Sequence, residues 1–345
     1  MLYRNLAPAA AVLAFLVVVL GAYVRLSNAG LGCPDWPGCF GHITVPEGAQ
    51  ARAAALQAFP ARPVDARIAW KEMIHRYFAG SLGLLILAVG VMAWKRRHRA
   101  RAQAWLALLL VGLVVLQATL GMWTVTRLLT PLVVSAHLLG GMAILALLVW
   151  LALGAQGLRP VATAKMRRLK PWARGALALV YAQIGLGAWV STNYADFGCT
   201  GFPTCNGAWW PAMNFHQAFD FFHPLGLRPD GQPLTQAALA AIQWTHRLGA
   251  GLTLVYVGAL CLAAMRLEGV RALAAAVASC LVAQVLLGIA TVVWDHPWPV
   301  ALAHNALAAL LLSSVVALNF RLGAPTRRVP APVSHPPEEI ACPIP

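Results

Sequence analysis

Charged side chains are scarce in this chain of 345 residues. They make up 11% of it, whereas soluble domains carry about 25%. Hydrophobic residues reach 60%, above the roughly 45–50% of soluble domains, and the mean hydropathy is +0.68. The scarcity of charge excludes a soluble globular protein and indicates an integral membrane protein.

Acidic residues are the rarer sign, with 11 Asp and Glu against 26 Lys and Arg. A basic excess is also typical of nucleic-acid-binding proteins. Here, however, the positive charges stand between apolar runs, which is the pattern of cytoplasmic loops under the positive-inside rule. We therefore expect a lipid bilayer and no nucleic acid as a partner.

The first apolar run lacks a small-residue cleavage site, which argues against a secretory signal peptide. We interpret it as the first of eight runs long enough to cross a bilayer, which takes roughly 20 residues each. The predicted helices span about 7–26, 73–94, 103–124, 131–153, 171–191, 240–264, 271–293 and 299–320. The fold class is thus predicted to be an all-α integral membrane protein with eight transmembrane helices.

Lys and Arg gather in the connections after every second run and after the last run, for example at Lys95–Arg101 and Arg159–Arg174. These segments are expected to be cytoplasmic, together with both termini. The long connections 27–71 and 192–239 then lie outside the cell membrane. The Pro-rich stretch 324–345 is predicted to be a disordered cytoplasmic tail.

The two halves of the chain repeat each other. Several matched features recur at an offset of roughly 166–171 residues, as four-helix units related by an axis along the membrane normal would show. They are the pairs Cys33/Cys39 and Cys199/Cys205, the segments Gln117–Gly121 and Gln284–Gly288, and His137 and His304. We predict two tandem four-helix bundles, 1–156 and 157–323, with pseudo-two-fold symmetry.

Four histidines lie inside apolar runs, namely His75, His137, His246 and His304. From the rise per residue, all four are expected within roughly 10 Å of the outer surface. Neutral imidazole is a good iron ligand, so His75 with His137, and His246 with His304, are predicted to clamp one porphyrin each. The alternative is that each histidine only hydrogen-bonds a neighbouring helix. A zinc or copper site would need thiolates or further acids at this depth, and the sequence has none there.

Arg76 and Arg247 each follow one of these histidines. Arginine pairs well with carboxylates, so both are candidates for binding porphyrin propionates. Snorkelling to lipid headgroups is an equally good interpretation.

Glu72 makes the two halves unequal. It stands one helical turn before His75, whereas Gln243 stands before His246. An amide cannot exchange protons at neutral pH, so Glu72 is the candidate catalytic acid or base of the first half. The alternative is an acid that caps its helix N-terminus.

The two cysteine pairs are expected on the oxidising side of the membrane, where each can close a short loop as a disulfide. Turn-forming residues lie inside both loops. Static loop staples and a thiol–disulfide couple that exchanges electrons both remain open.

Together these motifs resemble the haem A synthase family over nearly all of residues 7–320. The resemblance is carried by the stretch Val24–Gly41, the segments Glu72–Arg76 and Trp244–Arg247, and the histidines of the fourth and eighth runs. It implies oxidation of a methyl group of haem O to a formyl group, giving haem A for terminal oxidases. It also implies that a glutamate at Glu72 is needed for activity.

The resemblance further implies that residues 1–156 hold the substrate haem O at His75 and His137. Residues 157–323 then hold the cofactor haem B at His246 and His304. As a bacterial-type member, the protein is expected in the plasma (inner) membrane, with haem O synthase as a candidate partner and an electron-transfer partner that the sequence does not identify. The main rival is a di-haem cytochrome b subunit linked to quinone, which explains the histidines but not the single acid. A quinone-linked disulfide-forming protein explains the cysteines but not the buried histidines.

Overall fold

The computed structural model describes residues 2–98, 100–157, 163–225, 227 and 231–323. Within these residues the regular structure is helical, and eight helices are long and apolar enough to cross a membrane. They are α1 (Leu2–Leu26), α3 (Ala66–Lys95), α4 (Arg101–Thr126), α5 (Pro131–Ala155), α6 (Ala164–Thr192), α8 (Gln236–Met265), α9 (Arg271–Val293) and α10 (Trp298–Leu322). The predicted all-α membrane fold is confirmed.

Several helices begin well before the apolar run that predicts them. The carboxylate of Asp65 caps α3 by accepting bonds from the backbone N–H groups of Arg67 and Ile68. Thr163 caps α6 in the same way. Since α3 begins at Ala66, Glu72 lies well inside the helix, and capping of the N-terminus is left to Asp65.

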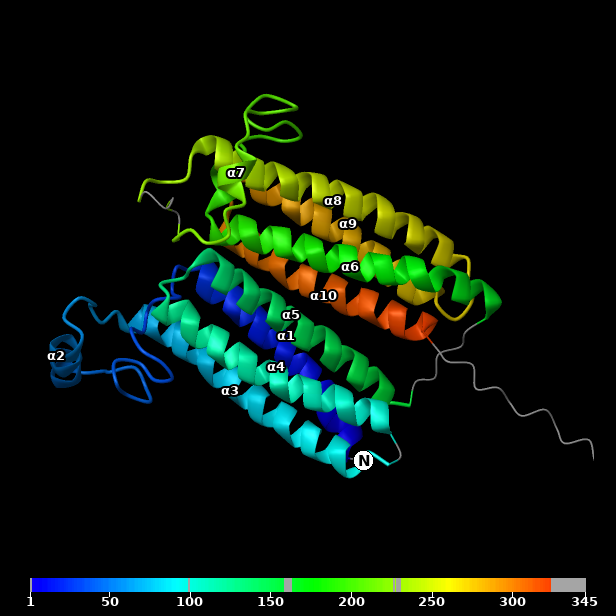
Figure 1. Cartoon of the computed structure of the whole chain (residues 1–345), viewed down its shortest axis with the longest axis horizontal. Helices are drawn as coiled ribbons and strands as arrows, with labels where there is room; N and C mark the ends of the chain where they lie inside the picture. Colours follow the sequence, from blue (N-terminus) through cyan, green and yellow to red (C-terminus); the bar gives the residue numbers. More distant parts are fainter. Residues whose placement is uncertain (1, 99, 158–162, 226, 228–230, 324–345) are drawn as a thin grey trace, which may run out of the picture.

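The long helices form two four-helix bundles (Figure 1). In the first, α1 and α4 each pack against both α3 and α5. In the second, α6 and α9 each pack against both α8 and α10. Between the bundles, α5 packs against α6 and α10, and α1 packs against α10. A two-fold relation would give this pattern, although the axis itself stays a prediction.

Backbone conformation repeats at matched positions as well. Asn28 and Tyr194 follow α1 and α6, and both have φ 52°. Phe40 and Asn206 each follow the second cysteine of a loop, and both have φ 54°. Non-glycine residues rarely adopt this left-handed region, so the coincidences support a duplicated design.

Polar contacts join the bundles across an otherwise apolar core. The hydroxyls of Ser135 and Thr192 lie 3.1 Å apart, and the Tyr181 hydroxyl donates to the backbone oxygen of Leu139. Arg25 of α1 donates to the backbone oxygen of Ser191 at the end of α6. These contacts fix the two bundles against each other close to the site described below.

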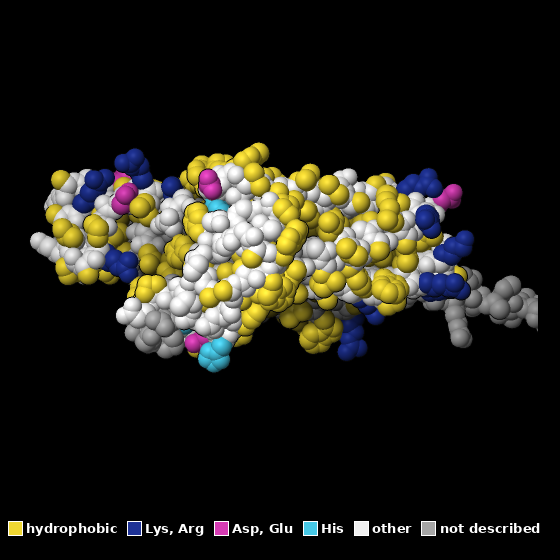
Figure 2. Space-filling model, turned by 90° about the horizontal axis from the view of Figure 1, so that it is seen from above, with side chains coloured by type: hydrophobic (Ala, Val, Ile, Leu, Met, Phe, Trp, Pro, Cys, Tyr) yellow, Lys and Arg dark blue, Asp and Glu magenta, His cyan; other side chains and the backbone are white. Residues whose placement is uncertain are grey.

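The long connections share one end of the molecule, which we call the loop end (Figure 1). It carries α2 (Ala49–Ala58), the 3-10 helix η1 (Ala195–Gly198) and α7 (Phe215–Ala218). The start of α1 and the end of α10 lie at the opposite end. Figure 2 shows apolar side chains along the helices of one face, with Lys and Arg at both ends of the molecule. The predicted tail 324–345 lies outside the described residues.

Candidate functional site

The four histidines occupy equivalent places in the two bundles, each in the part of its helix that is nearest the loop end. Each ring packs against a glycine of a neighbouring helix. A Cβ on that glycine would lie 3.0–3.3 Å from the histidine Cε1, in the pairs Gly21–His75, Gly121–His137, Gly187–His246 and Gly288–His304. Such separations are tighter than ordinary van der Waals contact. Glycine therefore lets each imidazole stand directly against a helix backbone.

Each bundle brings two of these histidines near each other. His75 lies within electrostatic range of His137, and His246 lies within range of His304. All four side chains are half-buried. Their pairing brings together two residues from two helices of one bundle.

A porphyrin iron fits this donor set. Nδ1 of His75, His137 and His304 is buried without a hydrogen-bond partner among the described residues. A buried unpaired nitrogen is unfavourable, and a ligand would relieve it. The described residues hold no cluster of three or more His, Cys, Asp or Glu suited to a protein-ligated metal ion. Haem iron can be held by two imidazoles without a third ligand from the protein, and this is the set of ligands that each bundle offers.

Contacts to neighbouring helices are present too. The ring of His75 hydrogen-bonds the backbone of Val17 on α1. Nδ1 of His246 lies 3.0 Å from the amide nitrogen of Gln183 on α6. Hydrogen bonds to neighbouring helices therefore account for part of the histidine contacts. They do not explain the ring nitrogens that lack a partner.

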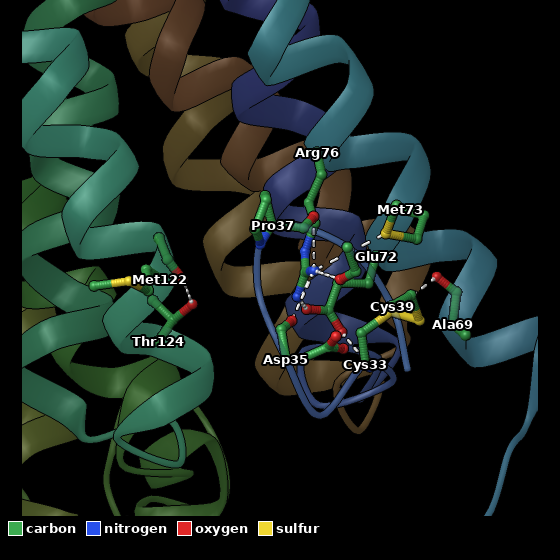
Figure 3. A network of polar contacts seen from close by, with 12 residues as sticks. Cys33, Asp35, Pro37, Cys39, Ala69, Glu72, Met73, Arg76, Met122 and Thr124 are labelled. Atoms are coloured by element: carbon green, nitrogen blue, oxygen red, sulfur yellow. Dashed lines mark hydrogen bonds and ion pairs between the residues drawn. A yellow bond between two sulfur atoms is a disulfide. The ribbon is translucent and has the colours of Figure 1, made fainter. Parts of the chain in front are cut away.

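Glu72 is buried beneath the first cysteine loop, with 5% of its surface exposed. Its Oε2 accepts a hydrogen bond of 3.0 Å from the backbone N–H of Cys33, and its Oε1 forms an ion pair with Arg76 (Figure 3). Arg76 in turn donates to the backbone oxygens of Asp35, at 2.9 Å, and of Gly38. The acid is therefore fastened to both the loop and its own helix.

Arg247 fastens the second cysteine loop in a related way. It donates to the backbone oxygens of Cys199, Gly201 and Thr204 at 3.0–3.2 Å. Gln243 is as buried as Glu72, but its Oε1 has no partner among the described residues. Both arginines thus hold cysteine loops, a role that the sequence does not reveal. Their predicted contact with propionates stays a prediction.

Both cysteine pairs are closed as disulfides, Cys33 with Cys39 and Cys199 with Cys205. The sulfurs are fully buried over the ends of α3 and α8. Asp35 shapes the first loop by accepting from the backbone N–H groups of Phe40 and Gly41. The pairing follows the sequence prediction, while a redox role for either pair is untested.

The fold and site define a class: a multi-pass membrane protein with two four-helix bundles, each of which carries two histidines inside its helices. The chain matches the family described as Cytochrome oxidase assembly protein over residues 4–316. It is 41% identical to "Heme A synthase" of Shewanella oneidensis, over 90% of this chain and 94% of the relative. Relatives of the same name from Rhodospirillum centenum and Sphingopyxis alaskensis are 32% and 30% identical, over 88% and 91% of this chain and 83% and 90% of their own lengths. The chain belongs to this cytochrome oxidase assembly family.

Proposed function

We propose that this protein is a haem A synthase, which oxidises a methyl group of haem O to the formyl group of haem A. Relatives carry that name, among them one that is 41% identical over 90% of this chain. The family description, assembly of cytochrome oxidase, agrees with a product destined for terminal oxidases.

One observation carries the proposal: the bundles match in their histidines and differ in the buried residue one turn before the first of them. Glu72 precedes His75, whereas Gln243 precedes His246, and both side chains are 5% exposed. Electron transfer alone needs no acid in either bundle. A carboxylate in one bundle indicates that proton-coupled chemistry takes place there and not in the other.

We assign the substrate haem O to His75 and His137 in residues 1–156. We assign the cofactor haem B to His246 and His304 in residues 157–323. When bound, haem B supplies a one-electron relay. The two histidines of each bundle orient their porphyrin, and the lipid around the helices accommodates the farnesyl tail of haem O.

In two successive oxidations of the methyl group, each taking one oxygen from water and giving up two electrons and two protons, a hydroxymethyl group and then a geminal diol would form; the diol loses water to leave the aldehyde. Each oxidation releases protons as well as electrons. We assign the acceptance of protons to Glu72, because it stands one turn before His75 and its side chain is buried under the loop. Arg76 and the Cys33 N–H hold that carboxylate in place.

We place the protein in the plasma (inner) membrane with both termini cytoplasmic and the cysteine loops outside. Lys and Arg are frequent in and around the segments of the sequence that join α3 to α4 and α5 to α6, which supports this orientation. Haem O synthase is a candidate supplier of the substrate, and an electron-transfer partner must remove the electrons.

The variant Glu72→Gln tests the proposal. Because general acid–base groups contribute about 100-fold or more, haem A formation should fall at least about 100-fold. Haem B should stay bound, since His246 and His304 are untouched. Gln243→Leu, at the matching buried position, is the control and should keep forming haem A. Undiminished product in Glu72→Gln would refute the role of the acid.

Pigment extraction separates this function from that of a di-haem cytochrome b. A synthase should yield haem B together with haem O, haem A or the hydroxylated intermediate. Haem B alone in two equal sites would favour the cytochrome.

A further inference from the structure

The second long connection exposes large apolar rings outside the transmembrane helices. Trp209 and Trp210 follow the second cysteine loop, and 68% and 69% of their surfaces are exposed. The surrounding segment, residues 197–219, contains no Lys, Arg, Asp or Glu. Exposed apolar side chains that gather in this way mark a contact surface. The question is what covers it.

The cysteine loop lies against the side of α8 and not beyond its end. Gly198 approaches the helix so closely that a Cβ there would lie 2.3 Å from the backbone oxygen of Leu239. The disulfide between Cys199 and Cys205 packs in one buried cluster with Trp244. At 1.5 Å per residue, Trp244 is about 12 Å from the start of α8. The loop therefore lies beside the first three turns of a transmembrane helix.

The two tryptophans are tied to that loop. The backbone N–H of Cys205 donates to the oxygen of Ala208 at 2.9 Å, and the N–H of Ala208 donates back at 3.0 Å. Trp209 and Trp210 come directly after this pair, so they stay close to the loop. In Figure 1 the segment between η1 and α7 extends to the side of the second bundle, whereas α2 stands beyond the end of the first. Lipid surrounds the sides of a transmembrane bundle.

Tryptophans at the helix ends mark the level of this segment. Trp294 follows the last residue of α9 and Trp298 begins α10, and they are 63% and 54% exposed. Exposed tryptophans at the ends of transmembrane helices are typical of the membrane–water interface. The 3-10 helix η1 lies at the same level, because the ring centroids of Phe197 and His296 are 4.8 Å apart. The second connection thus leaves the helices at the height of the interface.

We propose that residues 199–212 form a membrane anchor, in which Trp209 and Trp210 insert into the interface of the leaflet at the loop end. The bilayer is the occupant because this surface continues the apolar sides of the transmembrane helices at the same level. Indole suits the place, since its ring is apolar and its N–H can reach headgroups or water. The lack of charge in 197–219 removes the cost of taking ions out of water. The anchor does not depend on which haem each bundle holds.

Quenching by brominated lipid tests the anchor on the full-length protein. The protein is placed in nanodiscs of phosphatidylcholine, either plain or brominated near the top of the acyl chains, because bromine quenches indole fluorescence on contact. The double variant Trp209→Phe, Trp210→Phe keeps two aromatic rings, and its spectrum subtracted from that of wild type isolates the two tryptophans. We expect this difference signal to lose most of its intensity in the brominated lipid.

Two added tryptophans calibrate the signal. Leu56→Trp places a ring on α2, where the native side chain is 49% exposed, and its signal should not change with bromine. Val115→Trp places a ring in the middle of α4, where the native side chain is 64% exposed, and its signal should be quenched. A signal from Trp209 and Trp210 that behaves like that of Leu56→Trp would overturn the proposal, because the rings would then face water or another protein. The single variants Trp209→Phe and Trp210→Phe give the same reading if the double variant does not fold.

Discussion

The carboxylate of Glu72 accepts a hydrogen bond from the backbone N–H of Cys33, the first cysteine of the loop above it. The contact joins residues 39 positions apart and is fully buried. Arg76 reinforces it, because the same guanidinium binds Glu72 and the backbone oxygens of the loop (Figure 3). The position of the acid therefore depends on the conformation of the loop.

Opening the first loop should impair catalysis more than haem binding. The double variant Cys33→Ser, Cys39→Ser removes the disulfide that sets the loop beside Glu72. Small displacements of catalytic groups can cost about 100-fold, so we expect haem A formation to fall roughly 10–100-fold. The readout is the ratio of haem A to haem B in membranes. The matched variant Cys199→Ser, Cys205→Ser leaves the contact of Glu72 intact and should lose less. Equal losses in the two variants would contradict a positional role for the first loop.

Filling the space beside a histidine should weaken haem retention. A Cβ at Gly187 would lie 3.1 Å from Cε1 of His246, so Gly187→Ala must push the imidazole away from α6. We expect about tenfold weaker haem B retention, measured as haem per chain after purification. Gly258→Ala in α8 is the control, since a Cβ there meets no atom within 4 Å. Equal haem content in both variants would argue against tight packing of the ring.

The stability of the loop end should depend on pH through Asp196. Burial raises the pKa of Asp196 in η1, and the nearby charges of His296 and Arg25 oppose that shift. An acid whose pKa is raised by folding favours the folded state below its unfolded pKa. That contribution is lost as pH rises through the folded pKa. The contribution of Asp196 to the stability of the folded state is therefore expected to fall as pH rises above 3.8, the ordinary pKa of an Asp side chain.

Asp196→Asn should remove this part of the pH dependence. Thermal unfolding in detergent, followed by intrinsic fluorescence in steps upward from about pH 4, should show a smaller fall in Tm for the variant than for wild type. Parallel curves for the two proteins would show that Asp196 does not titrate with the raised pKa.

Much of the frame can be predicted from the sequence, because apolar runs of membrane-spanning length are a strong signal. The histidines follow by the same logic, since polar side chains inside such runs are rare. The extension of α3 back to Ala66 could not be predicted from apolarity, because its first turns are polar and depend on the cap at Asp65.

Contacts between segments that are distant in the sequence are harder to predict. His223 lies in the long connection 192–239, yet it is 1% exposed and lies against Trp189. A loop that folds back over a helix leaves no periodic pattern to detect. The contact of Gln183 with His246 is similar, although the glutamine–glycine spacing marks the residue as a contact between helices.

The central claim is that the two histidine pairs hold different haems. The most direct measurement is extraction and chromatography of the haems from wild type, His75→Ala and His246→Ala. We predict that His246→Ala loses haem B, and that His75→Ala keeps haem B but loses haem O and haem A. Loss of the same haem from both variants would contradict the account.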